Sequence, residues 1–290
     1  MTVMVTGASG VLGRAVVRAL VRHDEVRATV RRPEAAHALR ELGAKVTIRD
    51  ATEPDELLEV LSRVHTLVHL VGGVNQPSDE EILVANHGST VAAVAAAKEA
   101  KVRRVVLLSV PGASLDALHP FVRAKGLAEE VVTESGLEHA VLRSTHAFGL
   151  GGLWFTSTVV GAEHGFVVGD GRQRVAPVSA DDVAAVVAAI DDRRDHVDGT
   201  WSVAGPHEHT ADEVFAIAAE VEAAPAHLDP VAAAVRLTEL LGIPVSPRAT
   251  ELFAAASVAD APDAAAAFGV TTTPFVDGLR ALAAKTPEGG

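Results

Sequence analysis

The sequence predicts an α/β protein built on a doubly wound parallel sheet, with a smaller C-terminal lobe that interleaves with it. Strand-like apolar runs alternate with helical patterns over the first 146 residues, as expected for a parallel sheet covered by helices. The runs 66–70 and 104–108 are mostly apolar without strict alternation, which is typical of strands buried on both faces. After residue 146 the alternation gives way to short elements and a glycine-rich break at 149–152.

The elements of the first half follow from local residue patterns. We expect strands where β-branched and aliphatic residues cluster, near 2–6, 26–30, 45–48, 66–70, 104–109 and 139–143. We expect helices where apolar residues recur at helical spacing, near 11–22, 34–42, 54–62, 79–100 and 120–135. These elements predict a core domain over residues 1–146.

The second half predicts a smaller lobe over residues 147–290, of which 174–204 interleave with the core. We expect short strands near 166–168, 174–178 and 199–204, and helices near 180–191 and 210–222. Residues 228–285 are rich in Ala and helical in pattern, with breaks at Pro244, Pro247 and Pro274. We expect residues 286–290 to form a loose tail.

Composition excludes several classes of function. The formal net charge of −13 argues against nucleic acid and anionic membranes as partners. The absence of cysteine excludes disulfides, thiolate nucleophiles and Cys-ligated metal centres. No apolar run reaches the length of a membrane span and a strand begins at once, so we expect neither a membrane span nor a signal peptide. We expect a cytoplasmic monomer or homodimer that binds a small-molecule substrate.

The turn after the first strand indicates a dinucleotide-binding site. Gly7, Gly10 and Gly13 are spaced G-x-x-G-x-x-G between a strand and a helix. Glycines let the backbone approach a pyrophosphate, and Gly13 would let the helix pack closely on the sheet. Unpaired N–H groups at a helix start bind phosphate. The predicted phosphate contacts are Gly7, Ser9, Gly10, Val11, Leu12 and Gly13; the alternative is a glycine-containing loop without a ligand.

A second signal concerns the ribose of the cofactor. In this architecture an acidic residue about 20 positions after the turn accepts the 2′-hydroxyl of NAD, whereas arginine accommodates a 2′-phosphate. Arg31 and Arg32 stand at this place, with no carboxylate before Glu34. The pair favours NADP(H) over NAD(H). The alternative interpretation is a solvated basic pair at a strand end.

On these motifs the chain resembles the atypical and extended short-chain dehydrogenase/reductases, among them NmrA-like proteins and relatives of the respiratory complex I 39 kDa subunit. The resemblance covers residues 1 to about 215 and implies a Rossmann fold. It implies that Asp50 and Ala51 lie beside the adenine and that the loop with Val71, Gly72 and Gly73 borders the ribose. Ser109 resembles the serine at the end of the fifth strand, and Lys125 the active-site lysine of the Y-x-x-x-K motif.

Two departures from the family pattern bear on the reaction, although the cofactor motifs are present. Phe121 stands where the family has its catalytic tyrosine, and the whole chain contains no tyrosine. Lys125 can then keep only its ribose role, because the acid that it would activate is missing. Ser144 follows Arg143 where relatives commonly have proline, which makes the nicotinamide end of the resemblance less secure.

Three residues are candidate proton donors in place of the tyrosine: Ser109, His119 and His146. Each has a structural alternative, since serine can satisfy backbone groups at a strand end and the chain has 13 histidines. Glu129, four residues after Lys125, is expected to pair with it on the helix surface.

Aromatic residues indicate an apolar or aromatic substrate. Phe148, Trp154 and Phe155 follow the sixth strand, and Phe121 lies on the preceding helix; the alternative is that they form the core of the lobe. Reduction of a quinone, enone or imine needs orientation against the nicotinamide more than it needs a tyrosine.

The sequence therefore predicts an NADP(H)-dependent reductase of such a substrate. Two alternatives stay open: a non-catalytic redox sensor that binds NADP(H), and a non-redox isomerase or cyclase on the same fold. The segment His207-Glu208-His209 could suggest a metal site. No further ligand is indicated elsewhere in the sequence to complete it, so the sequence predicts no metal site.

Overall fold

The computed structural model describes residues 1–220 and 224–284. The chain divides into two compact units. The large unit comprises 1–144, 180–203 and 260–271, and the small unit comprises 145–179, 204–259 and the described residues from 272 onward. The chain thus passes between the two units five times, and residues 180–203, most of the segment predicted to interleave with the core, belong to the large unit.

The large unit is built on a seven-stranded sheet in which every pairing is parallel. The strand order is β11-β6-β5-β4-β1-β2-β3. The doubly wound parallel sheet is therefore confirmed. The strands are β1 (Thr2–Thr6), β2 (Glu25–Val30), β3 (Lys45–Ile48), β4 (Thr66–His69), β5 (Arg104–Ser109), β6 (Glu138–Ser144) and β11 (Asp198–Val203).

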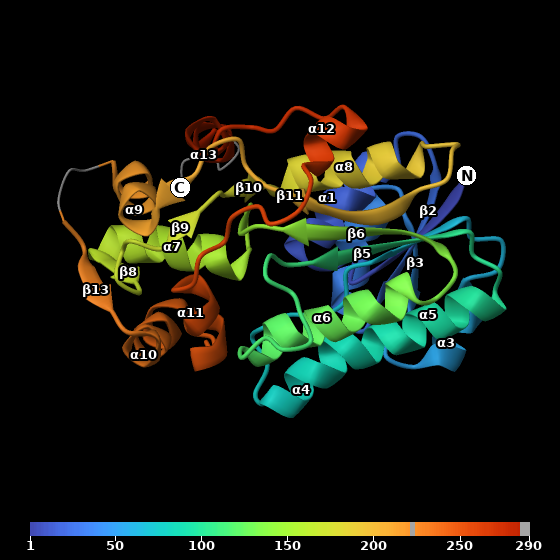
Figure 1. Ribbon diagram of the computed structural model, residues 1–290, viewed down its shortest axis with the longest axis horizontal. Coiled ribbons are helices and arrows are strands. Elements are labelled where there is room, and N and C mark those ends of the chain that lie inside the picture. Colours follow the sequence, from blue (N-terminus) through green and yellow to red (C-terminus); the bar gives the residue numbers. More distant parts are fainter. Residues whose placement is uncertain (221–223, 285–290) are drawn as a thin grey trace. The chain divides into compact units, whose positions relative to one another are not determined.

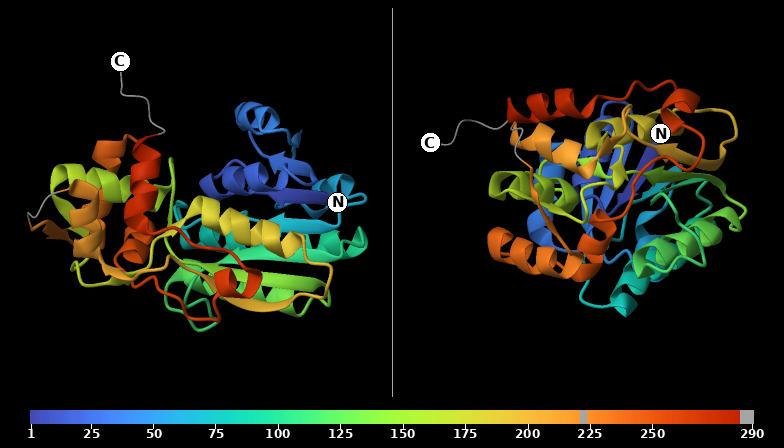
Figure 2. Two further views of the ribbon diagram at one scale, coloured as in Figure 1. Left: turned by 90° about the horizontal axis from the view of Figure 1, so that it is seen from above. Right: turned by 60° about the vertical axis from the view of Figure 1, so that its left-hand side comes forward.

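Helices cover both faces of this sheet (Figure 1). On one face α1 (Val11–Leu20) packs along α8 (Ala180–Asp191), and both views of Figure 2 show them side by side. On the other face lie α3 (Pro54–Val60), α5 (Ser89–Glu99) and α6 (Pro120–Thr133), whose apolar residues join those of the central strands in one buried cluster. Two short helices, α2 (Ala36–Glu41) and α12 (Ala264–Phe268), also belong to the large unit.

The helix predicted over 79–100 is interrupted in the structure. It begins as α4 (Asp79–Leu83), passes through the π-turn η2 (Val84–Gly88), and continues as α5. The helix predicted over 34–42 likewise begins with a 3-10 turn, η1 (Pro33–Ala35), before α2. Helical periodicity predicts both segments but does not resolve a single wider or tighter turn within them.

Within its described residues the small unit contains four longer helices and three two-stranded pairings. Its helices are α7 (Leu153–His164), α9 (Ala211–Ala219), α10 (Pro230–Leu241) and α13 (Phe275–Ala283), with the shorter α11 (Pro247–Phe253). The strand pairs are β7 (Ala147–Phe148) with β10 (Val178–Ser179), β8 (Phe166–Val168) with β13 (Ala226–Leu228), and β9 (Arg174–Val175) with β12 (His209–Thr210).

Two differences from the predicted elements of the second half have simple causes. The strand predicted at 174–178 is two short strands, because Pro177 cannot donate a ladder hydrogen bond. Helix α7 was not predicted, since its β-branched residues and Gly161 mask a helical pattern. The predicted tail at 286–290 lies outside the described residues. Within 1–220 and 224–284, no helix has the length and apolar character needed to cross a membrane.

Candidate functional site: a dinucleotide cradle in the large unit

The glycine turn has the geometry that its sequence predicts. Gly7 adopts φ +71°, and a Cβ there would lie 2.6 Å from the carbonyl group of Leu70 on the neighbouring loop. A Cβ on Gly13 would lie 2.4 Å from the Gly7 carbonyl oxygen, so Gly13 packs against the turn itself. Gly10 is the N-cap of α1, and no side chain caps this helix. The first N–H groups of α1 therefore face the turn without a side-chain acceptor, which suits a bound phosphate.

A pocket of about 220 Å³ opens above this turn in the large unit. It lies where the loops after β1, β2 and β4 meet, and β1 is the strand at which the chain order reverses. Ligands of open parallel sheets bind at this switch point, outside the carboxyl ends of the strands. The lining residues are Gly7, Ser9, Gly10, Thr29, Val30, Arg31, Arg49, Asp50, Ala51, Thr52, Leu70, Val71, Gly72, Gln76 and Ala85.

One buried polar atom of this pocket fits a ligand. Thr29, near the end of β2, is 2% exposed, and its hydroxyl has no hydrogen-bond partner within the described part of the chain. A buried hydroxyl without a partner costs free energy, which a bound hydroxyl or phosphate oxygen would recover. The glycine cradle and the Thr29 hydroxyl together therefore fit a dinucleotide.

Two arginines line the end of the pocket that follows β2 and β3. Arg31 is one of the predicted pair, and Arg49 was not singled out from the sequence. Arg32 is not among the lining residues and instead precedes the turn η1. Arg49 donates to Glu59 Oε2 through Nη2 at 2.9 Å and Nε at 3.3 Å, and its Nη1 donates to the Ile48 carbonyl at 3.0 Å. No spacing rule connects the residue after the third strand with the cofactor, so the sequence could not have identified Arg49.

Asp50 lines the same pocket, but its carboxylate is engaged locally. The oxygen Oδ1 accepts hydrogen bonds from the backbone N–H of Thr52 at 3.0 Å and from the Thr52 hydroxyl at 2.9 Å. The backbone N–H of Asp50 donates to Glu56 at 2.8 Å. This turn holds Asp50 and Ala51 at the pocket edge, at the place that the family resemblance implies for the adenine.

The loop after β4 is held by Asn86, which the sequence analysis did not identify. Asn86 lies in the π-turn η2 and is fully buried. Its Oδ1 accepts a hydrogen bond from the Gly73 N–H at 3.1 Å, while its Nδ2 donates to the Gly73 carbonyl at 3.1 Å and to the Ile82 carbonyl at 2.7 Å. Gly72 has φ +130°, and a Cβ there would lie 2.1 Å from Oδ1. A side-chain amide thus fixes the loop that the resemblance places at the ribose.

Lys125 reaches the same region from α6. Its side chain is buried, and Nζ donates to the Leu108 carbonyl at 3.0 Å. Nζ also lies 5.8 Å from the centroid of the Phe121 ring, one turn earlier on the helix. Burial lowers the pKa of Lys125 to about 8. Phe121 is 6% exposed, so this residue packs under the lysine and offers no proton.

Ser109, a predicted proton donor, is bound to a carboxylate. Its hydroxyl donates to Glu129 at 2.5 Å, and Arg143 contacts the other oxygen of Glu129 at 2.7 Å. Arg143 also contacts Asp260 at 2.9 Å, and Asp260 accepts from the Gly112 N–H at 2.7 Å. The expected pairing of Glu129 with Lys125 is therefore wrong, because Glu129 is buried toward β5 and β6 and bonds to Ser109 and Arg143.

The two predicted histidines have structural surroundings. His119 is the N-cap of α6, and its Nδ1 accepts a hydrogen bond from the Phe121 N–H at 3.3 Å. His146 belongs to the small unit, where it stacks on Trp154 with ring centroids 4.9 Å apart. Burial lowers the pKa of His146 to about 4, so its ring is neutral at physiological pH. Their role as proton donors stays a prediction.

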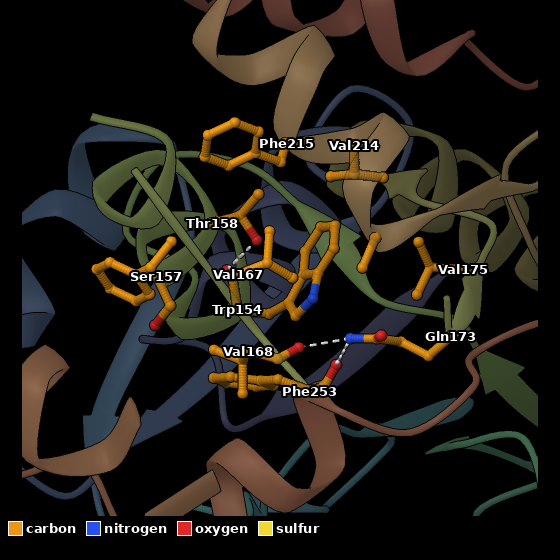
Figure 3. A pocket seen from close by; sticks show the side chains of 12 residues that line it. Trp154, Ser157, Thr158, Val167, Val168, Gln173, Val175, Val214, Phe215 and Phe253 are labelled. Carbon is orange, nitrogen blue, oxygen red and sulfur yellow. Dashed lines mark hydrogen bonds between the residues drawn. The ribbon is translucent and has the colours of Figure 1, made fainter. Parts of the chain in front are cut away.

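The aromatic residues that were predicted to contact the substrate lie in different parts of the structure. Phe148 and Phe155 form a core cluster of the small unit with Phe275, and the rings of Phe148 and Phe275 lie 5.1 Å apart. Trp154 instead lines a pocket of the small unit (Figure 3), and Phe121 lies in the large unit under Lys125. The alternative of a lobe core therefore describes Phe148 and Phe155.

The fold and the glycine cradle define a Rossmann-type nucleotide-binding protein. The chain belongs to the NAD(P)H-binding family, whose model matches residues 7–193. The resemblance to atypical short-chain dehydrogenase/reductases and to relatives of a complex I subunit is thereby confirmed. One curated relative is NADH dehydrogenase [ubiquinone] 1 alpha subcomplex subunit 9 of Arabidopsis thaliana, which is 27% identical over 224 residues, 73% of this chain and 56% of the relative. The chain spans about half the length of the curated relatives it matches first.

Two solved structures show the same fold over nearly the whole chain. One is the triphenylmethane reductase of Citrobacter sp. complexed with NADP(H), with a TM-score of 0.77 and 19% identity over 97% of this chain and 100% of that one. The other is the NADPH-dependent quinone oxidoreductase QOR2 of Escherichia coli complexed with NADPH, with a TM-score of 0.74 and 21% identity over 97% and 99%. At these identities the likeness establishes the fold alone.

Proposed function

We propose that this chain is an NADP(H)-dependent reductase of a small apolar or aromatic conjugated substrate of the quinone, enone or imine type. The observation that carries the proposal is the Phe121–Lys125 pair. The ammonium of Lys125 is retained and buried, while the residue one turn before it offers only a ring. A site of this kind favours substrates whose reduced form is stabilised by conjugation, because no tyrosine protonates a developing alkoxide.

The chemistry balances without a protein acid. NADPH supplies a hydride, which is two electrons and one proton, to the conjugated acceptor. A quinone or enone would then hold a delocalised negative charge and take a proton from water, whereas an imine would accept the hydride in its protonated iminium form and leave as a neutral amine. The residues of the chain would bind and orient the cofactor: the glycine turn would hold the pyrophosphate, and Lys125 and the Gly72 loop, which Asn86 fixes, would border the ribose. Solved structures of similar fold include proteins named as a quinone oxidoreductase and a triphenylmethane reductase.

Cofactor preference follows from the charge at the pocket end. Arg31 and Arg49 both line the cradle, and two guanidiniums favour the dianionic 2′-phosphate of NADP(H). Asp50 accepts from Thr52 through Oδ1, which holds its carboxylate in the turn at the pocket edge. NADP(H) is therefore the proposed cofactor.

The test combines binding and turnover. NADPH and NADH affinities are measured for the wild type, Arg31→Ala and Arg49→Ala, with Arg32→Ala as the matched control outside the pocket lining. We expect the first two variants to lose roughly 10- to 150-fold in NADPH affinity, since a charge-assisted contact contributes about 1.5–3 kcal/mol, and to bind NADH almost unchanged. Equal losses for both nucleotides would refute the assignment of the arginines.

Turnover is then followed as the loss of reduced-nicotinamide absorbance with a panel of quinones, enones and imines. Oxidation of NADPH by at least one member supports the reductase. Tight NADPH binding with no oxidation across the panel would favour the second candidate, a nucleotide-binding component that acts through a partner. That candidate draws support from a relative that is named as a subunit of a larger complex.

A further inference from the structure

A buried histidine lies at the base of the dinucleotide cradle. His69 is the last residue of β4, and in the register of the sheet it pairs with Thr6, the last residue of β1. Thr6 is fully buried and His69 is 1% exposed. The residues that follow these two strand ends, Gly7 and Leu70, line the cofactor pocket. His69 therefore belongs to the frame of the site, although it is not among the lining residues.

The imidazole ring of His69 joins three segments of the large unit. Its Nδ1 lies 2.8 Å from the hydroxyl oxygen of Thr6, and its Nε2 lies 3.3 Å from the hydroxyl oxygen of Ser89. Ser89 is fully buried and begins α5 directly after the π-turn η2. One ring thus connects the end of β1, the end of β4 and the helix that continues from the π-turn.

The neighbours of the ring fix which nitrogen carries the proton. The hydroxyl of Ser89 donates its single proton to the Ala85 carbonyl at 2.7 Å, so toward His69 it accepts a hydrogen bond from Nε2–H. Nδ1 of the neutral ring is then an acceptor, and the Thr6 hydroxyl donates to it. Burial, with a smaller contribution from Lys125, lowers the pKa of His69 to about 3. The ring is therefore neutral at physiological pH, and both of its hydrogen bonds have a fixed direction.

Each of these two hydrogen bonds supports a different wall of the cradle. Thr6 immediately precedes Gly7, where the chain enters the glycine turn with φ +71°. Ser89 immediately follows the π-turn, whose Asn86 holds both the N–H and the carbonyl of Gly73. The bond to Thr6 thus anchors the phosphate turn, and the bond to Ser89 anchors the loop after β4.

We propose that His69 is a positioning residue of the cofactor site, which orders the glycine turn through Thr6 and the Gly72–Gly73 loop through Ser89. The proposal rests on the proposed nucleotide site and deepens it. Loops that are ordered before the ligand arrives bind it more tightly, because less conformational entropy is lost on binding. A histidine that only filled space in the core would not affect the two loops separately.

Two substitutions separate the two hydrogen bonds. The amide oxygen of asparagine lies as many bonds from the backbone as Nδ1 does, so His69→Asn keeps an acceptor for Thr6 and loses the contact with Ser89. The amide of glutamine reaches the position of Nε2, so His69→Gln keeps a donor for Ser89 and loses the contact with Thr6. His69→Leu removes both contacts.

Backbone amide exchange of the full chain, measured without nucleotide, reports on each loop. The Gly10 N–H donates to the Gly7 carbonyl at 3.2 Å and reports on the glycine turn. The Gly73 N–H donates to Asn86 at 3.1 Å and reports on the loop after β4. Ser135→Ala is the matched control, because this buried serine after α6 also makes two hydrogen bonds, one donated and one accepted.

We expect the two amide variants to have opposite effects. His69→Gln should speed exchange at Gly10 about fivefold, the equivalent of about 1 kcal/mol for one lost hydrogen bond, and leave Gly73 unchanged. His69→Asn should speed exchange at Gly73 and leave Gly10 unchanged. His69→Leu should speed both and weaken NADPH binding about fivefold or more in calorimetry. Ser135→Ala should change neither these rates nor the affinity.

Nitrogen NMR of the wild type should show the ring proton of His69 on Nε2. A proton on Nδ1 would contradict the direction of both hydrogen bonds and overturn the proposal. Unchanged exchange at Gly10 and Gly73 in the amide variants would also overturn it, and so would equal increases at both amides in both variants, which would indicate general loss of packing.

The affinity measurement adds a separate criterion. Unchanged NADPH affinity in folded His69→Leu would refute the positioning role, and if that variant fails to fold, His69→Asn and His69→Gln decide the question. Because the exchange rates are measured without nucleotide, they decide the role of His69 independently of the reaction. Absence of NADPH binding by the wild type would instead refute the proposed function.

Discussion

Replacement of Asn86 tests whether the π-turn serves the dinucleotide cradle. Asn86→Ala removes three hydrogen bonds, two to Gly73 and one to Ile82. At about 1 kcal/mol for each bond, the free energy of unfolding should fall by about 3 kcal/mol. The side chain is fully buried, so water does not replace the lost partners, and the Gly72–Gly73 segment loses its anchor.

The functional consequence is a weaker cofactor complex. The freed loop must be ordered when nucleotide binds, and fixing the backbone of one residue costs about 1–2 kcal/mol. We therefore expect NADPH affinity to fall about tenfold, measured by calorimetry at a temperature where the variant is folded.

Val84→Ala is the matched control for Asn86→Ala, because Val84 belongs to the same π-turn and is 52% exposed. This variant should keep both stability and affinity. A fall in stability for Asn86→Ala with unchanged NADPH affinity would refute the positioning role.

Three further predictions concern single residues. Burial raises the pKa of Asp191 above its ordinary value. The free energy of unfolding therefore falls as the pH rises from that ordinary value through the pKa of the folded state. Asp191→Asn should unfold at a higher temperature than the wild type at neutral pH and should lose part of this pH dependence. Because burial lowers the pKa of Lys125 to about 8, its charge is lost above that pH; NADPH affinity should decline there in the wild type and stay flat in Lys125→Met. Gly13→Ala places a Cβ against the Gly7 carbonyl and should abolish measurable NADPH binding, whereas Gly88→Ala, whose Cβ would meet only Val84 at 3.8 Å, should not.

The sequence predicts those parts of the fold that local chemistry controls. Strands β1, β3 and β5 have the predicted bounds, since buried parallel strands are short apolar runs between turn residues. The order of the strands was not predictable from local patterns, because it depends on crossovers. The seventh strand, β11, is an example: its sequence resembles a short lobe strand, and only the parallel pairing with β6 places it at the sheet edge.

In the candidate site, too, some residues were predictable from local sequence and others were not. The phosphate cradle follows from glycine spacing, because backbone conformation at Gly7 has a direct sequence signal. Arg49 and Asn86 have no such signal, since they reach the site from a strand end and a helix that lie next to it only in the folded chain. Glu129 illustrates the opposite error: helical spacing suggested Lys125 as its partner, but the helix face turns its carboxylate toward Ser109 and Arg143.

The π-turn Val84–Gly88 interrupts a regular helix, and it carries the side chain that positions the loop of the dinucleotide cradle. A wider turn holds an additional residue at some cost in helix geometry, and here that turn carries the side chain that anchors the Gly72 loop. Deletion of one residue from the turn would restore an uninterrupted α-helix and rotate Asn86 away by about 100°, the angle of one residue at 3.6 per turn. A regular helix would therefore lose the three hydrogen bonds from Asn86 to Gly73 and Ile82, so both stability and cofactor affinity favour keeping the π-turn.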